Sequence, residues 1–267
     1  MEKQNVIDVI ATAVKNAPNI RALFLSGSYG NGLADIYSDI DFLLVVEGGA
    51  SDQVSEIWRE AIGQTGEIVL WWQKPSRPHL INAITADWTR TDVVIRKPDQ
   101  LGSLTQAELE PLFDHDNIYA RLPDAPEERS RNPARLKFQF EEFIRILGLL
   151  HLAAGREEYI NGVLGVFHLR NLLVELLIEE MAAPNRGGVL HLNRLISDEQ
   201  KELLISLPPA LPDRESIIST HLAYAHAYLP RARRLAAQWG IEWPERFEAA
   251  TWEHLRNNLS IECPYVR

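Results

Sequence analysis

Two carboxylates, Asp39 and Asp41, stand at the start of an apolar run that otherwise has the composition of a buried strand. Burying an ionised carboxylate costs free energy unless it is paired or binds a metal. Alternate side chains of a strand point to the same face, so these two can share a divalent cation. Asp92, in the later apolar run TRTDVVI, supplies a third carboxylate. Three carboxylates on adjacent strands can hold the metal ions that stabilise an in-line phosphoryl or nucleotidyl transfer.

Gly27 and Ser28 end the preceding apolar run, with ten residues between Ser28 and Asp39. A glycine lets the backbone approach a phosphate closely, and the Ser28 hydroxyl can donate a hydrogen bond to a phosphate oxygen. A Gly-Ser pair by itself is common. It indicates a phosphate site here because it lies in a strand–loop–strand segment beside the carboxylates. The competing interpretation is a noncatalytic protein of the same fold, which would keep this loop.

Hydrophobic periodicity predicts the elements that position these residues. A helix is expected over residues 3–16, and strands are expected at Ile20–Leu25 and at Asp39–Val46. A short helix and three extended segments then follow, at 52–63, 66–73, 79–88 and 89–95. The predicted fold class is α+β, with a mixed sheet in this part of the chain.

The charged, proline-containing segment 122–135 is the predicted linker, and it divides the chain into domains at 1–130 and 131–267. The second domain is predicted to be a helical bundle with helices at 136–154, 158–181, 215–239 and 244–259. Pro184 and the glycines at 187–188 are expected to stop the second of these helices. Pro230 is expected to kink or split the third, because proline removes a backbone donor inside a helix.

The motifs resemble those of a known superfamily. Gly27-Ser28, Asp39-Ile40-Asp41 and the later Asp92 are similar to the signature of the DNA polymerase beta-type nucleotidyltransferases. The segment GSYGNG…YSDIDFLL looks like the aminoglycoside and lincosamide nucleotidyltransferases of that superfamily. LFDHDNIYARL, at 112–122, resembles the closing strand and turn of such domains, and the helical residues 151–177 look most like the lincosamide enzymes.

This resemblance implies an enzyme that moves AMP from ATP to a hydroxyl of a small molecule and releases pyrophosphate. An aminoglycoside or lincosamide antibiotic is the expected acceptor, and antibiotic resistance the expected role. Gly27 and Ser28 would bind the ATP phosphates, and Asp39, Asp41 and Asp92 would hold Mg²⁺, with two ions expected. Asp92 would hold the second ion or take the proton of the attacking hydroxyl; the sequence does not separate these roles. A homodimer is also compatible with the resemblance.

Acceptor recognition has weaker signals. His168, Asn171 and Glu175 fall on one line of the predicted helix 158–181, and Asn161 extends that line. They form either a solvent-exposed face or part of the acceptor site, with the helical domain as a second wall. Trp71, Trp72 and Trp88 are either ordinary core residues or include one that stacks on the acceptor, and the sequence does not decide between these alternatives.

Composition narrows the function classes. The formal net charge of −10 argues against nonspecific binding of nucleic acid, which usually needs a basic surface. The single cysteine, Cys263, forms no disulfide within the chain. The N-terminus lacks the pattern of a secretory signal, and no run of ~18 uninterrupted apolar residues predicts a membrane span. We expect a soluble cytoplasmic protein. Two other functions are alternatives to modification of an antibiotic. One is a nucleotidyltransferase that acts on a protein or RNA, as in toxin–antitoxin modules, and the other is a noncatalytic nucleotide-binding protein.

Overall fold

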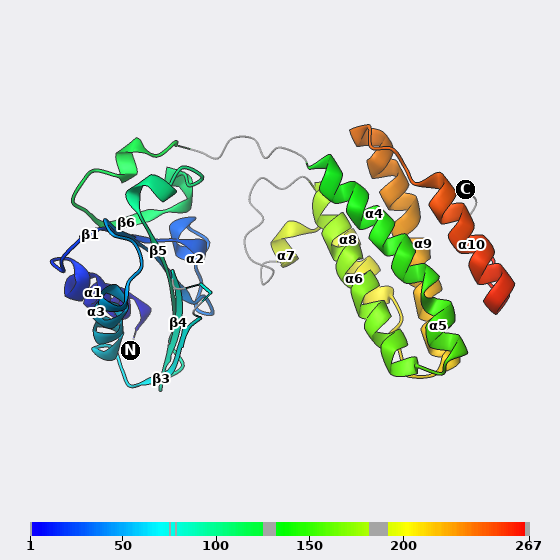
Figure 1. Cartoon of the computed structure of the whole chain (residues 1–267), viewed down its shortest axis with the longest axis horizontal. Coiled ribbons are helices and arrows are strands. Elements are labelled where there is room, and N and C mark those ends of the chain that lie inside the picture. The colour runs from blue at the N-terminus through cyan, green and yellow to red at the C-terminus, as the bar shows by residue number, and fades with distance from the viewer. Residues whose placement is uncertain (1, 75, 78, 125–131, 182–191, 265–267) are drawn as a thin grey trace. The chain divides into compact units, whose positions relative to one another are not determined.

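The computed structural model describes residues 2–74, 76–77, 79–124, 132–181 and 192–264. The chain forms two compact units, unit 1 at Met1–Arg129 and unit 2 at Ser130–Arg267. Unit 1 contains the strands and unit 2 is helical, which confirms the predicted α+β class (Figure 1). Residues 125–131 of the predicted linker lie outside the described residues, as do Pro184 and the predicted helix stop at 187–188.

Unit 1 is built on one six-stranded mixed sheet with the strand order β3-β4-β5-β2-β1-β6. Its strands are β1 Ile20–Leu25, β2 Ile40–Val46, β3 Ile68–Gln73, β4 Leu80–Thr85, β5 Arg90–Arg96 and β6 Glu110–Asp114. The central pair, β2 and β5, is parallel, while the other neighbouring pairs are antiparallel. The predicted mixed sheet is therefore confirmed, and the first predicted strand agrees with β1 at both ends.

Two helices, α1 (Lys3–Val14) and α3 (Asp52–Gly63), cover one face of the sheet (Figure 1). Their apolar side chains pack with those of the strands in a single buried cluster. Within it, the ring centroids of Phe42 and Trp58 lie 5.2 Å apart in an edge-on arrangement. The Ser51 side chain accepts a hydrogen bond from the backbone N–H of Val54 and caps the start of α3. This packing fixes which face of each strand is buried.

The opposite face is covered over only part of its width. The segment that contains the short 3-10 turns η1 (Pro98–Gln100), η2 (Gln106–Glu108) and η3 (Tyr119–Arg121) packs on the β1 and β2 side. It forms a second small core with side chains of those strands, made of Ala22, Phe24, Leu43, Val45, Leu101, Leu109 and Ile118. On the same face, the side chains of β3 and β4 remain partly or largely exposed.

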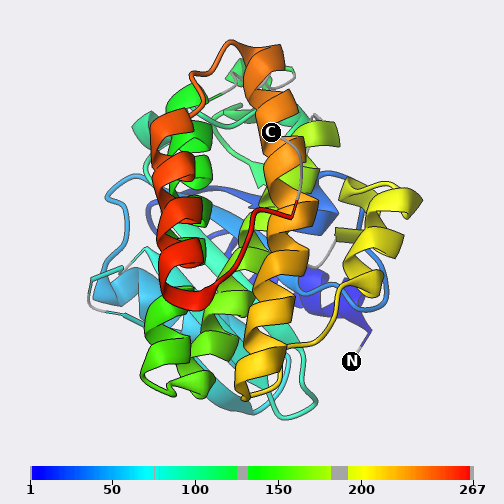
Figure 2. The ribbon, with the colours of Figure 1, turned by 90° about the vertical axis from the view of Figure 1, so that its right-hand side faces the viewer.

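Unit 2 is a helical bundle around one core, with its long helices side by side (Figures 1 and 2). Its helices are α4 Pro133–Gly148, α5 Leu150–Gly155, α6 Tyr159–Met181, α7 Leu192–Leu195, α8 Asp198–Ser206, α9 Arg214–Trp239 and α10 Glu245–Leu259. One expectation is corrected: the helix predicted at 136–154 is divided between α4 and α5 at Leu149. Helix α9 continues through Pro230 without being split, and the kink expected there as the other outcome stays a prediction.

The long helix α6 has the length and apolar composition of a membrane span, with a mean hydropathy of 1.3 over its most apolar window. It is the one such helix in the described part of the chain. Leu169, Leu173 and Leu176 on α6 are nevertheless buried in the core of unit 2. Composition alone is weak evidence for a span, because core helices have the same character.

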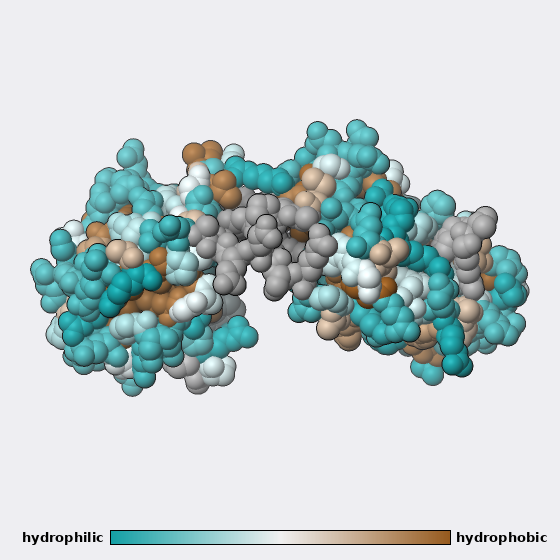
Figure 3. Space-filling view, turned by 90° about the horizontal axis from the view of Figure 1, so that it is seen from above, coloured by the Kyte–Doolittle hydropathy of each residue, from teal (hydrophilic) through white to brown (hydrophobic). Residues whose placement is uncertain are grey.

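Figure 3 shows hydrophobic residues interspersed with hydrophilic ones over the visible surface.

Candidate metal centre

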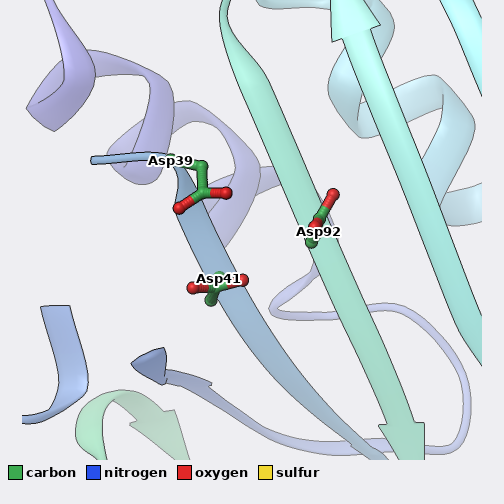
Figure 4. Close-up of side chains that lie close together, drawn as sticks. All are labelled: Asp39, Asp41 and Asp92. Atoms are coloured by element: carbon green, nitrogen blue, oxygen red, sulfur yellow. The ribbon is translucent and has the colours of Figure 1, made fainter. Parts of the chain in front are cut away.

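The three predicted carboxylates meet in unit 1. Asp41 on β2 lies directly beside Asp92 on β5 in the parallel register, and Asp39 immediately precedes β2. Figure 4 shows the three side chains together on these neighbouring strands. One carboxylate oxygen from each lies within 4.8 Å of the others. Among the described residues, no other group of three Asp, Glu, His or Cys side chains could hold a metal ion.

The electrostatics of the cluster favour a cation. The pKa of Asp41 is raised to about 6, first by burial and then by the negative charges of Asp39 and Asp92. Burial also raises the pKa of Asp92. One guanidinium, that of Arg90, forms an ion pair with Asp39 at 2.5 Å and partly offsets the repulsion. An all-oxygen set of carboxylates suits a hard divalent cation such as Mg²⁺.

Gly27 is packed against Asp41. A Cβ atom at this position would lie 2.0 Å from Asp41 Oδ2, closer than any van der Waals contact allows. The φ angle of Gly27 is +56°, in the left-handed region that favours glycine. The neighbouring Ser26 N–H donates a hydrogen bond of 2.9 Å to the backbone oxygen of Asp41. The end of β1 is thus held directly against a carboxylate of the cluster, and any larger residue at position 27 would displace that carboxylate.

The Ser28 hydroxyl lies in α2 (Gly27–Gly30), a single helical turn where the sequence predicted a loop. Ser28 Oγ is buried and has no hydrogen-bond partner among the described residues. A buried hydroxyl without a partner costs free energy, and a bound oxygen-rich group would provide one. The glycine that leaves no room for a side chain and this hydroxyl both fit a phosphate next to the carboxylates.

Two residues at this site were not predicted. Arg90 precedes Asp92 by two residues on β5, so the period of a strand would have placed both on one face. Asn82 on β4 lies opposite Asp92, and its side chain hydrogen-bonds to Asp92 and lowers the pKa of that carboxyl. No sequence signal marks Asn82, because its position depends on the pairing register of β4 with β5.

The predicted polar line on α6 belongs to unit 2. His168 and Asn171 are exposed, as is Asn161. Glu175 is partly buried and accepts a hydrogen bond of 2.7 Å from Arg135 on α4. These contacts fit a solvent-exposed face crossed by an ion pair between helices. The proposed acceptor role of the line stays a prediction.

The three tryptophans considered as stacking residues have different surroundings. Trp71 is partly buried, with the Arg59 guanidinium 5.4 Å from the centroid of its ring. Trp72 is 57% exposed on β3, and Trp88 is 75% exposed in the turn between β4 and β5.

Comparison with known proteins gives a family match in the N-terminal part of the chain. Residues 7–80 match the family model described as a nucleotidyltransferase domain. This stretch includes Gly27, Ser28, Asp39 and Asp41, and it ends before Asp92. The match confirms the predicted resemblance to nucleotidyltransferases and the expectation of an enzyme of this class. No match was found among curated proteins.

Solved structures give only distant similarities. The chain is similar to an aminoglycoside 6-adenyltransferase from Bacillus subtilis, with 13% identity, 95% of this chain and 97% of that chain covered, and a TM-score of 0.43. A spectinomycin adenyltransferase from Enterococcus faecialis, with ATP and spectinomycin, has 12% identity, coverages of 87% and 98%, and a TM-score of 0.30. A cytoplasmic RNA terminal U-transferase has 15% identity, coverages of 85% and 64%, and a TM-score of 0.30. Scores this low carry no argument about substrate.

Proposed function

Since residues 7–80 match a nucleotidyltransferase domain, we propose that the chain transfers AMP from ATP to a hydroxyl group of a small molecule and releases pyrophosphate. One observation carries this proposal: three carboxylates lie with their oxygens within 4.8 Å of one another, on the strand that follows Gly27 and Ser28 and on its parallel neighbour. A degenerate member of the fold would have no reason to keep three mutually repelling, partly buried carboxylates together.

Each residue has a defined part in the proposed reaction. Gly27 and Ser28 bind phosphate oxygens of ATP, the glycine by close backbone approach and the serine by its otherwise unpartnered hydroxyl. Asp39 and Asp41 hold Mg²⁺, and Asp92 completes the donor set, with two ions in the full site. Bound Mg²⁺ would neutralise phosphate charge and favour the ionised form of the attacking hydroxyl.

Asp92 has two proposed roles that the same geometry supports. It either ligates the second Mg²⁺ or accepts the proton of the acceptor hydroxyl. Burial raises its pKa, which suits a group that takes up a proton, and the Asn82 hydrogen bond keeps its carboxylate oriented. Asn82 and Arg90 act as positioning residues, because each contacts one carboxylate of the cluster.

The acceptor class rests on the resemblance of GSYGNG…YSDIDFLL to antibiotic-modifying nucleotidyltransferases. We propose an aminoglycoside or lincosamide antibiotic. A protein or RNA acceptor, and nucleotide binding without catalysis, are the alternatives that the experiment must separate.

The test is to titrate the protein with Mg²⁺-ATP and measure pyrophosphate release with aminoglycosides, spectinomycin, lincosamides, an oligonucleotide and water as acceptors. Mg²⁺-ATP should also raise the melting temperature, by mass action worth ~2.7 kcal/mol at about a hundredfold excess over Kd. ATP with a chelator should raise it much less. Asp39→Asn should remove both responses, and Asp52→Asn, an exposed carboxylate of the same unit, should remove neither.

Pyrophosphate release that depends on a small-molecule acceptor supports the proposal. Transfer only to the oligonucleotide or to the protein itself would mean that the acceptor is a nucleic acid or a protein and not a small molecule. A melting-temperature shift without release would indicate a noncatalytic nucleotide-binding protein, and equal shifts with and without metal would contradict the metal assignment.

A further inference from the structure

A row of side chains extends from the carboxylates across the open half of the sheet. Asp41 lies beside Asp92, Asp92 is opposite Asn82, and Asn82 is opposite Trp72. Residues paired directly across neighbouring strands point to the same face of a sheet. Trp72 on the edge strand therefore shares a face with the metal centre, although the two are far apart in sequence.

A second row runs alongside the first. Leu70 on β3 is opposite Ile84 on β4, and Ile84 is opposite Arg90 on β5, the residue that pairs with Asp39. We call the four side chains of β3 and β4 in these two rows the platform: Leu70, Trp72, Asn82 and Ile84. The platform lies on the strands next to β5, which carries Asp92, so a molecule lying on the platform would reach the metal centre along one face of the sheet.

The platform differs from the reverse side of the same strands. Ile81, Ala83 and Val93, which point the other way, are at most 1% exposed beneath α1 and α3. Trp72 is 57% exposed and Leu70 is 37% exposed. The Lys74 ammonium lies 5.2 Å from the centroid of the Trp72 ring, at cation–π distance, and the indole stays exposed. An exposed indole next to an incompletely covered sheet face is a suitable surface for the flat face of a ring.

The spacing of the strands sets the size of the ligand. Trp72 and Asp92 are separated by two strand spacings, about 10 Å. A molecule that stacks on the indole and presents a hydroxyl at Asp92 must span that distance, which is roughly the length of two linked rings. Between them lies Asn82, whose amide holds Asp92 and retains further hydrogen-bonding capacity for a polar group of the ligand.

We propose that the platform is the acceptor subsite and that Trp72 stacks on a ring of the acceptor one ring removed from the hydroxyl that is modified. This inference rests on the proposed function and specifies it: the acceptor is a small molecule of at least two linked rings. It also distinguishes the three candidate tryptophans, because Trp71 pairs with Ala83 on the covered face and Trp88 lies in a turn outside both rows.

The test compares Trp72→Ala and Trp72→Phe with Val69→Ala in the full-length protein. Val69 is on the same strand and is also 57% exposed, but it lies at the register shift outside the platform. The probes are multi-ring aminoglycosides, spectinomycin and lincomycin, with saturating Mg²⁺-ATP. For the compounds that wild type modifies, Trp72→Ala should raise KM about tenfold, equivalent to ~1.4 kcal/mol, with kcat within about threefold. Trp72→Phe should recover most of the loss, and Val69→Ala should match wild type.

A separate measurement keeps the two proposals apart. The melting-temperature rise with Mg²⁺-ATP should be the same in wild type and Trp72→Ala. An unchanged KM in Trp72→Ala, or an equal rise of KM in Val69→Ala, would contradict the proposed acceptor subsite. Neither result would contradict the proposed nucleotide site. Transfer to the oligonucleotide alone, or to no multi-ring compound despite a normal Mg²⁺-ATP response, would also overturn it. Loss of the Mg²⁺-ATP response in wild type would instead refute the proposed function itself.

Discussion

A carboxylate is fully buried in unit 2 and three are partly buried in unit 1, and their surroundings differ. In unit 2, Glu248 is 1% exposed and is compensated on all sides: it pairs with Arg233 and accepts hydrogen bonds from the indole N–H groups of Trp243 and Trp252 at 2.7 and 3.3 Å. In unit 1, Asp39, Asp41 and Asp92 lie against one another with one guanidinium and one amide near them.

This difference separates a carboxylate that stabilises the fold from carboxylates that suit the proposed metal site. A side chain that stabilises the fold is supplied with donors by the fold itself, because an unpaired buried charge is costly. The carboxylates of unit 1 keep an unbalanced charge, which the raised pKa values of Asp41 and Asp92 reflect. Because perturbed carboxyls cluster at functional sites, the proposed metal ion would supply the compensating charge here.

The largest effect is expected when a carboxylate of the cluster is neutralised. Asp41→Asn should lower the rate of AMP transfer by about a thousandfold or more, equivalent to ~4 kcal/mol in the barrier. Its melting temperature without metal should stay the same or rise, because the substitution removes charge repulsion. Pyrophosphate release and a melting curve measure the two quantities. A rate within about tenfold of wild type would contradict the metal assignment.

The matching change in unit 2 should have the opposite profile. Glu248→Ala removes the buried partner of Arg233 and the acceptor of two indole N–H groups, leaving Arg233 its exposed partner Glu245, and we expect it to destabilise the protein by about 3 kcal/mol. Denaturant unfolding measures this loss. Whatever protein remains folded should keep the melting-temperature response to Mg²⁺-ATP; if that response vanished while the fold survived, the division between structural and functional carboxylates would be wrong.

An intermediate effect follows from the pKa of Asp41, which is raised from 3.8 to about 6 in the folded protein. Between these values the folded state binds a proton that the unfolded state has lost, so this group adds stability as the pH falls. That contribution is complete below about pH 4 and is lost as the pH rises through about 6. In the presence of a chelator, the stability difference between Asp41→Asn and wild type should be largest above about pH 7 and should shrink towards pH 4. Parallel pH profiles for the two proteins would contradict this expectation.

The smallest effect is expected at Glu175. Its ion pair with Arg135 is partly exposed on both sides, and such pairs contribute between 0 and about 1 kcal/mol. Glu175→Gln should therefore change the melting temperature by little. Steady-state kinetics with a working acceptor decide the remaining question: an unchanged KM means a solvent-exposed face, and a raised KM with unchanged ATP affinity means that the α6 line contacts the acceptor.

The parts of the site that local patterns encode could be predicted. Asp39 and Asp41 share a face by the period of a strand, and the Gly-Ser pair ends the strand before them. Asn82 and Trp72 could not be assigned to the site, because only the register of β3, β4 and β5 aligns them with Asp92. The helix 136–154 was predicted as continuous because its apolar spacing continues across Leu149, and spacing carries no information about where the axis breaks.

The parallel register of β2 and β5 also determines when the site comes into existence during folding. Asp41 and Asp92 meet only after two strands distant in sequence have paired, and such nonlocal contacts form slowly. A slip of one residue would turn Asp92 into the apolar layer that Val93 and Ile95 occupy, so the packing of that layer also selects the register that forms the site. If the proposed metal site binds Mg²⁺, the appearance of that affinity during refolding reports correct strand registration, an event that collapse of the chain alone does not produce.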